Sequence, residues 1–176
     1  MACAGCDTCD PKIGYYEVHV TSLDPYFEEK CNKLGYKHIS VTDAFSGRLD
    51  KMTSVKIKTD VITDVYNLAQ DICDNISNVV RVKLESHIDS IPHTGGYYES
   101  HIEVTGDFEK LKKFAKKHKL MLSYNSKMIL TKKSKEPYNL FALLKYLDVN
   151  NFIVNKVIRE YTFFDTNPNY DSTMLS

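Results

Sequence analysis

The chain has 176 residues, a length that suits one domain or two small halves sharing a core. Hydrophobic residues make up 43% and charged residues 26%, a composition that excludes an intrinsically disordered chain. The 23 lysines and arginines balance the 23 aspartates and glutamates, so no overall field favours nucleic acid or a membrane surface as a partner.

The N-terminal residues 1–12 are expected to form a Cys-rich tail. They lack the basic start and apolar run of a signal peptide, and no later run approaches the roughly 20 apolar residues of a membrane-spanning helix. We therefore expect no membrane association and a cytoplasmic location, which is the host cytoplasm if the protein is viral. Cys3, Cys6 and Cys9 have a CxxCxxC spacing that suits zinc or an iron–sulfur cluster. Such sites usually need four ligands and no fourth is evident nearby, so a tail with reactive thiols and no metal is the alternative.

The first half, residues 13–90, is predicted to alternate strands and helices. Period-two alternation predicts strands over 15–22, 36–42, 52–59 and 79–88. Asp24-Pro25 and Asp60 are typical of helix starts, and they precede helices that end near residues 34 and 76. The second of these helices carries a continuous apolar stripe.

The second half, residues 97–166, restarts the same order after a Gly-rich linker at 91–96. Tyr97-Tyr98-Glu99-Ser100-His101 repeats Tyr15-Tyr16-Glu17-Val18-His19 at four of five positions. The pattern then predicts a helix after Asp107, a hairpin over 120–133, a helix that opens at Pro137 and a last strand over 156–165. A polar C-terminal tail follows at 167–176.

This order predicts an α+β fold of two tandem ferredoxin-like βαββαβ repeats, an internal duplication that forms one pseudo-twofold domain. Each repeat would cover one sheet face with two helices and leave the other face open. The two sheets are expected either to pack face to face or to join edge to edge around a central cleft.

The open face is the predicted functional site, because alternation places one set of polar residues on it. The candidates for catalysis are Glu17, His19, Glu99 and His101, and the candidates for ligand binding are Thr21, Arg81, Lys83 and Glu85. One imidazole could accept a proton while the other donates one. Arg81 and Lys83 could hold a phosphate group.

Two alternatives use the same residues. The first is a polar, hydrogen-bonded interface between the sheets with no ligand. The second is a divalent metal ion held by the two histidines and two glutamates. Glyoxalase-like folds use such ligands, but their repeat lacks the second helix expected here.

The motifs resemble two families. His19-Val20-Thr21 is similar to the His-x-Thr/Ser motif of the 2H phosphoesterases, but Glu103 stands where the second motif needs a hydroxyl residue. The duplicated Tyr-Tyr-Glu-x-His segments and the C-terminal run Arg159-Glu160 to Asn167 resemble a family of bacterial and large-DNA-virus proteins without an established activity. This second resemblance spans residues 15–171 and implies no substrate.

Taken together, the residues predict a protein that binds a small anionic ligand, such as a nucleotide or phosphoester, in the cleft between the two halves. Hydrolysis of that ligand is a further expectation. The alternative is a non-catalytic structural or interaction module whose Glu/His pairs only close the interface.

Overall fold

The computed structural model describes residues 14–88 and 95–171. The residues before the gap form β1 (Gly14–Ser22), α1 (Phe27–Leu34), β2 (His38–Asp43), β3 (Leu49–Thr53), β4 (Val55–Thr59), α2 (Ile62–Asn75) and β5 (Val79–His87). The residues after it form β6 (Tyr97–Thr105), α3 (Phe108–Lys117), β7 (Met121–Tyr124), β8 (Met128–Ser134), α4 (Phe141–Val149) and β9 (Ile153–Asp165). The predicted linker at 91–96 and the Cys-rich tail at 1–12 lie wholly or mostly outside the described residues.

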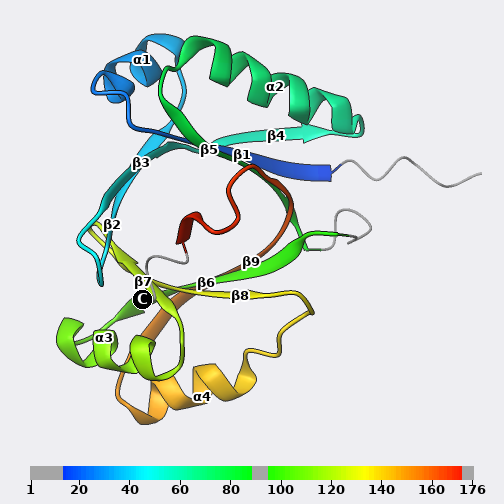
Figure 1. The fold of residues 1–176 in the computed structure, drawn as a ribbon. Helices are drawn as coiled ribbons and strands as arrows, with labels where there is room; N and C mark the ends of the chain where they lie inside the picture. Colours follow the sequence, from blue (N-terminus) through cyan, green and yellow to red (C-terminus); the bar gives the residue numbers. More distant parts are fainter. Residues whose placement is uncertain (1–13, 89–94, 172–176) are drawn as a thin grey trace, which may run out of the picture.

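All the strands belong to one antiparallel sheet that closes into a barrel, seen end-on in Figure 1. Their order is β3-β2-β7-β8-β6-β9-β5-β1-β4, and β1 also pairs with β3, which closes the ring. β3 and β4 are separated only by Ser54 and both pair with β1, so they act as one bent strand of an eight-stranded barrel. Closure leaves the barrel without a long unpaired edge.

The predicted fold of two tandem ferredoxin-like repeats is wrong, and so is the internal duplication that it implied. No boundary divides the sheet, because β5 pairs with β9 over Lys83↔Asp165 to His87↔Glu160. On the far side, β2 pairs with β7 over Thr42↔Tyr124 and Asp43↔Ser123. Backbone groups at these strand edges satisfy their hydrogen bonds across the two parts of the chain, and one closed barrel results.

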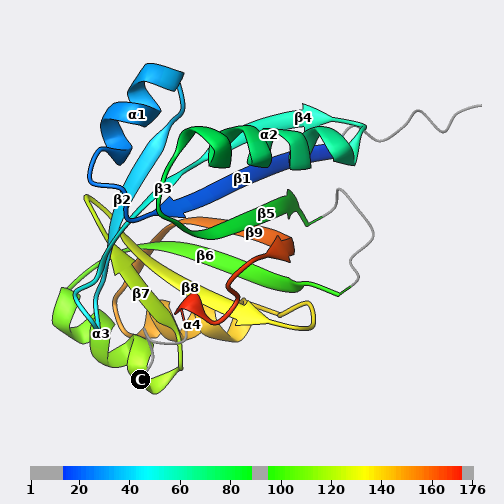
Figure 2. The ribbon, with the colours of Figure 1, turned by 45° about the horizontal axis from the view of Figure 1, so that its top comes forward.

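The hydrophobic core lies outside the barrel wall, in two layers beneath the helices. One layer joins α1 and α2 to β1 and β5 through Val18, Val20, Phe27, Ile72 and Leu84, all fully buried. The other joins α3 and α4 to the second set of strands and contains Ile102, Leu111, Leu122, Leu130 and Leu147. Each such side chain contributes about 1.5–3 kcal/mol by leaving water. The helix pairs cover opposite sides of the barrel (Figures 1 and 2).

Because side chains alternate along a strand, covering one face with helices fixes what the other face carries. Val18 and Val20 point to α1 and α2, so Glu17, His19 and Thr21 point into the barrel. Leu84 is likewise under the helices, which turns Lys83 and Glu85 inward.

The helices begin and end for local reasons. Asp107 caps α3 by accepting a hydrogen bond from the Lys110 backbone N–H at 2.8 Å. Gly35 ends α1 with φ +71°, a left-handed conformation that glycine adopts without strain. No helix among the described residues has the length and apolar character needed to cross a membrane.

Candidate functional site

The barrel encloses a cavity of about 330 Å³ that is lined by both apolar and charged side chains. The apolar ones are Ile39, Val41, Met52, Met121, Ile129 and Ile158. The charged or titratable ones are Glu17, His19, Asp50, Lys56, Arg81, Lys83, Glu85, Glu99, His101, Glu160 and Asp171. A small molecule with an apolar part and a charged part would fit such a site.

The structure brings all eight predicted catalytic and ligand-binding residues to this one cavity. The register of β1 and β5 sets three of them opposite one another: Glu17↔Glu85, His19↔Lys83 and Thr21↔Arg81. Glu99 and His101 arrive from β6. Cys3, Cys6 and Cys9 lie outside the described residues, so the predicted N-terminal metal site stays a prediction.

Two polar residues from the same strands do not line the cavity. His87 is exposed at the end of β5. Glu103, the residue that departs from the phosphoesterase motif, forms an ion pair with Lys127 at 2.9 Å.

His19 has an acceptor at each ring nitrogen. Nδ1 donates to the Thr53 carbonyl oxygen at 3.2 Å, and Nε2 lies 2.8 Å from Glu85 Oε2. Burial by itself lowers the pKa of the imidazole, but Glu85 outweighs it and the pKa is raised above its ordinary value. The contact with Glu85 therefore favours the protonated form of His19.

His101 is held by two carboxylates and a hydroxyl. Nε2 lies 3.3 Å from both Glu99 Oε2 and Glu160 Oε2, and Nδ1 lies 2.9 Å from Thr131 Oγ1. Burial lowers the pKa of the ring, but the bonds to Glu160 and Glu99 prevail and raise that pKa to about 10. In this arrangement His101 is a cation at neutral pH.

Lys83 ties the two histidine sites together. Its Nζ lies 2.6 Å from Glu85 Oε1 and 2.7 Å from Glu99 Oε2. Burial alone would raise the pKa of each carboxyl, yet Lys83 and the adjacent histidines lower the pKa of Glu85 to about 2 and that of Glu99 well below its usual range. Both carboxylates are thus charged, and both are almost fully buried.

Arg81 is the centre of a second cluster at the same cavity. Its Nε and Nη2 bind the two oxygens of Asp165 at 3.0 and 2.6 Å, and Nη1 binds Asp171 Oδ2 at 2.7 Å. Lys133 Nζ reaches the same Asp171 oxygen at 2.5 Å. Tyr97 donates its hydroxyl hydrogen to Asp165 at 2.5 Å.

The residues that bring Asp171 here belong to the predicted C-terminal tail. After β9 the chain turns back over the barrel opening, where Figure 1 shows it in red. The Tyr170 hydroxyl donates to Asp50 at 2.7 Å, and the Arg48 guanidinium lies 4.1 Å from the centre of the Tyr170 ring.

Sequence reasoning missed Lys133 and Glu160 as site residues. Glu160 was visible by alternation, since Ile158, Glu160 and Thr162 share one face of β9, whereas its neighbour Arg159 lies on the other face. The structure separates these neighbours: Arg159 donates to the Tyr138 carbonyl oxygen at 3.0 Å, whereas Glu160 faces His101. Lys133 follows Lys132 in a Lys-rich stretch, but alternation places Lys133 on the same face of β8 as Ile129 and Thr131, which line the cavity.

The same motif has different surroundings in its two copies. Glu17 accepts a hydrogen bond from Ser54 and lies 3.9 Å from the exposed Lys56, and its side chain is 16% exposed. Glu99 is 1% exposed and contacts Lys83, Lys133 and His101. The second copy is therefore the more deeply embedded in the charge network.

One group of described residues has the donor set of a metal site. Atoms of Glu85, His101 and Glu160 lie within 4.8 Å of one another. This set differs from the predicted one, which took its glutamates from the Glu-x-His motifs.

No protein-family model matches this chain. A search of curated protein sequences finds no match either. The resemblance to bacterial and large-DNA-virus proteins therefore stays a prediction, and the function must be argued from the cavity itself.

Proposed function

We propose that the barrel binds a small anionic ligand, of the phosphoester or nucleotide class, with its anionic group at Arg81 and Lys133. The observation that carries the proposal is the position of Asp171. Its carboxylate, supplied by the segment after β9, accepts from Arg81 Nη1 at 2.7 Å and lies 2.5 Å from Lys133 Nζ. An anionic group already occupies this place between two cations.

Arg81 has the geometry to exchange that group for another anion. Its Nε and Nη2 are fixed by Asp165, which leaves Nη1 directed at Asp171. Guanidinium groups bind carboxylates and phosphates by the same charge-assisted hydrogen bonds, so a phosphate oxygen can replace the Asp171 oxygen. Burial lowers the pKa of Arg81, but the acidic neighbours raise it above its ordinary value, and the cation persists.

The rest of the cavity suits the body of such a ligand. The apolar side chains of Ile39, Val41, Met52, Met121, Ile129 and Ile158 line the same cavity as Arg81. A base or another flat apolar group could cover these side chains while the phosphate group reaches the cations.

The histidines favour binding over hydrolysis. General acid–base catalysis by two imidazoles needs one of them neutral. His19 and His101 both contact carboxylates, and both have a raised pKa, which favours the protonated form of each. Hydrolysis stays a prediction, which a comparison of phosphodiesterase activity between the wild type, His19→Ala and His101→Ala would test.

The second candidate is a non-catalytic structural module. It is favoured by the pairing of the buried charges, since Arg81, Lys83, His19 and His101 each contact at least one carboxylate. Such a network could serve only to fill the barrel.

Calorimetric titration with inorganic phosphate and adenosine monophosphate separates these candidates. We expect Asp171→Asn to bind more tightly than the wild type, by about tenfold, because the competing carboxylate is gone. Lys133→Gln should bind more weakly, by about tenfold, because one cation is lost.

Lys132→Gln is the matched control, since Lys132 lies on the same strand but its Nζ is near the Tyr138 ring instead of Asp171. It should bind like the wild type. Failure of both the wild type and Asp171→Asn to bind at about 1 mM ligand would favour the structural candidate. Equal affinities of the two lysine variants would also count against the proposed site.

A further inference from the structure

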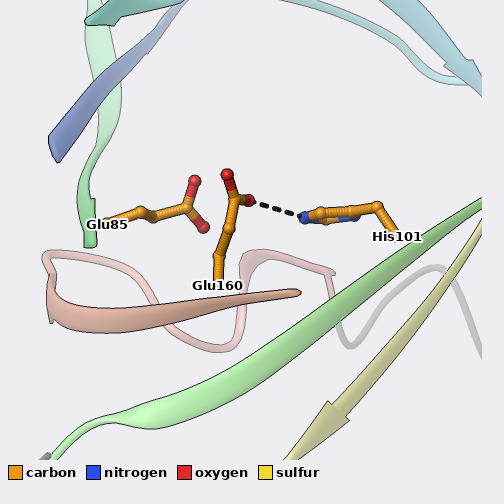
Figure 3. A group of neighbouring side chains, drawn as sticks. All are labelled: Glu85, His101 and Glu160. Carbon is orange, nitrogen blue, oxygen red and sulfur yellow. Dashed lines mark ion pairs between the residues drawn. The ribbon is translucent and has the colours of Figure 1, made fainter. Parts of the chain in front are cut away.

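We infer that Glu85, His101 and Glu160 form a binding site for one divalent transition-metal ion inside the barrel. The three residues come from β5, β6 and β9, which are adjacent in the sheet in the order β6-β9-β5. One nitrogen or oxygen from each lies within 4.8 Å of the others. Figure 3 shows the two carboxylates and the imidazole pointing toward one another.

A second observation concerns Glu85 alone. Glu85 is 1% exposed, and its Oε1 is held by Lys83 at 2.6 Å and by the Thr162 hydroxyl at 3.1 Å. Its Oε2 is buried and lies 2.8 Å from His19 Nε2 as an ion pair, without the geometry of a regular hydrogen bond. A carboxylate oxygen has two lone pairs, so beside His19 the Oε2 atom retains one that a cation can use.

The donor set indicates the class of metal. One imidazole nitrogen and two carboxylate oxygens suit Mn²⁺, Fe²⁺ or Zn²⁺ better than soft Cu⁺, which prefers sulfur. The two carboxylates match the charge of the ion. Ligand distances of about 2.0–2.2 Å require the three side chains to draw together around it.

Neighbouring groups orient two of these ligands. Thr131 Oγ1 lies 2.9 Å from His101 Nδ1, which leaves Nε2 as the metal-binding nitrogen, and the ion takes the place of the proton that Nε2 holds between Glu99 and Glu160. Lys83 and Thr162 fix the other oxygen of Glu85. Such outer contacts are typical of metal ligands, because they hold the ring and the carboxylate in one orientation.

This site is distinct from the Arg81–Lys133 anion site and does not rest on it. Among the described residues, none of the three metal ligands forms an ion pair with Arg81 or Asp171. Either site can therefore exist without the other, and the metal is tested with no anionic ligand present.

Mn²⁺ is the probe, added to the full chain after treatment with EDTA and removal of the chelator. It avoids the thiolates of Cys3, Cys6 and Cys9, because sulfur ligands select softer metals. Electron paramagnetic resonance should show one bound ion per chain, and its pulsed form should show coupling to one imidazole nitrogen. Glu160→Gln and His101→Gln should each raise the Kd at least about tenfold, and the nitrogen coupling should disappear in His101→Gln.

Glu103→Gln is the matched control, because Glu103 shares β6 with His101 but pairs with Lys127. It should bind Mn²⁺ like the wild type. Circular dichroism without metal verifies that each variant is folded. If a variant does not fold, the nitrogen coupling of the wild type still tests the site. No binding by the wild type below about 1 mM, no nitrogen coupling, or equal losses in all three variants would overturn the inference.

Discussion

Two carboxylates hold Arg81, and they come from different kinds of region. Asp165 is the last residue of β9, and its backbone lies opposite Lys83 of β5 in the sheet. Its two carboxylate oxygens bind Arg81 Nε and Nη2. Asp171 lies beyond the last strand, in the segment that turns back over the barrel. It contacts Arg81 and Lys133 but has no strand partner.

The difference separates a structural contact from an exchangeable one. The pairing of β9 with β5 holds the Asp165 backbone in place beside Arg81, because this residue is part of the sheet. Asp171 can leave when a short segment moves, at the cost of a few side-chain contacts. The carboxylate of Asp165 is thus part of the barrel, whereas the carboxylate of Asp171 occupies a place that a ligand could take.

The largest expected effect is that of Asp165→Asn. It removes the charge that binds two nitrogens of Arg81 and accepts the Tyr97 hydroxyl, inside a buried cluster. Breaking a buried ion pair is strongly destabilising, and Asp171 alone would then balance the Arg81 charge, so we expect a loss of about 3 kcal/mol in the free energy of unfolding, measured in urea. A loss no larger than that of Asp171→Asn would contradict the structural role assigned to Asp165.

Acid should weaken the same cluster. Burial raises the pKa of both aspartates, but Arg81 and Tyr97 lower that of Asp165, and Lys133 and Arg81 lower that of Asp171, below the ordinary value. A lowered folded-state pKa contributes stability that is present above the unfolded pKa of about 3.9 and is lost as pH falls further. The melting temperature should therefore fall by several degrees between pH 5 and pH 3. The fall should be shallower in Asp165→Asn, and parallel curves would exclude Asp165 as a cause.

Asp171→Asn should cost less, about 1 kcal/mol. Its side chain is 13% exposed, Arg81 keeps Asp165, and Lys133 keeps Glu99 at 3.3 Å. Exposed or partly compensated pairs contribute little. Urea unfolding measures this loss. A value of about 3 kcal/mol would place Asp171 with Asp165 as part of the barrel and weaken the case for exchange.

Tyr170→Phe is expected to have the smallest effect. It removes the hydroxyl that donates to Asp50 at 2.7 Å and keeps the ring that lies near Arg48. The loss should be about 0.5–1.5 kcal/mol, the usual contribution of one hydrogen bond. If this segment competes with the ligand, the variant should also bind phosphate more tightly than the wild type in calorimetry. A weaker affinity would instead make Tyr170 part of the binding site.

Much of the interior could be predicted from alternation alone. The pattern in 15–22 and 79–88 put valine and leucine on one face and Glu17, His19, Lys83 and Glu85 on the other, and the structure places these four in one cavity. Alternation is a local property of the backbone, so it survives an error in the overall fold. The apolar stripe predicted for the helix after Asp60 is confirmed at three positions, since Val65, Ala69 and Ile72 of α2 are buried.

The closure of the sheet could not be predicted from the same pattern. Alternation fixes which face a residue lies on but says nothing about which strand edges pair. The pairings β5–β9 and β2–β7 involve residues far apart in sequence, and they turned the expected pair of separate sheets into one barrel.

By itself, the sequence determined the polar face and most of the residues on it, because period-two alternation acts over a few residues. Only the tertiary structure decided the partners. Glu160 meets His101 because β9 lies between β5 and β6, and Asp171 meets Arg81 and Lys133 because the chain turns back after β9. These contacts depend on closing a ring of strands, and the distance between two charges in that ring is fixed by the order of the strands and not by their separation along the chain.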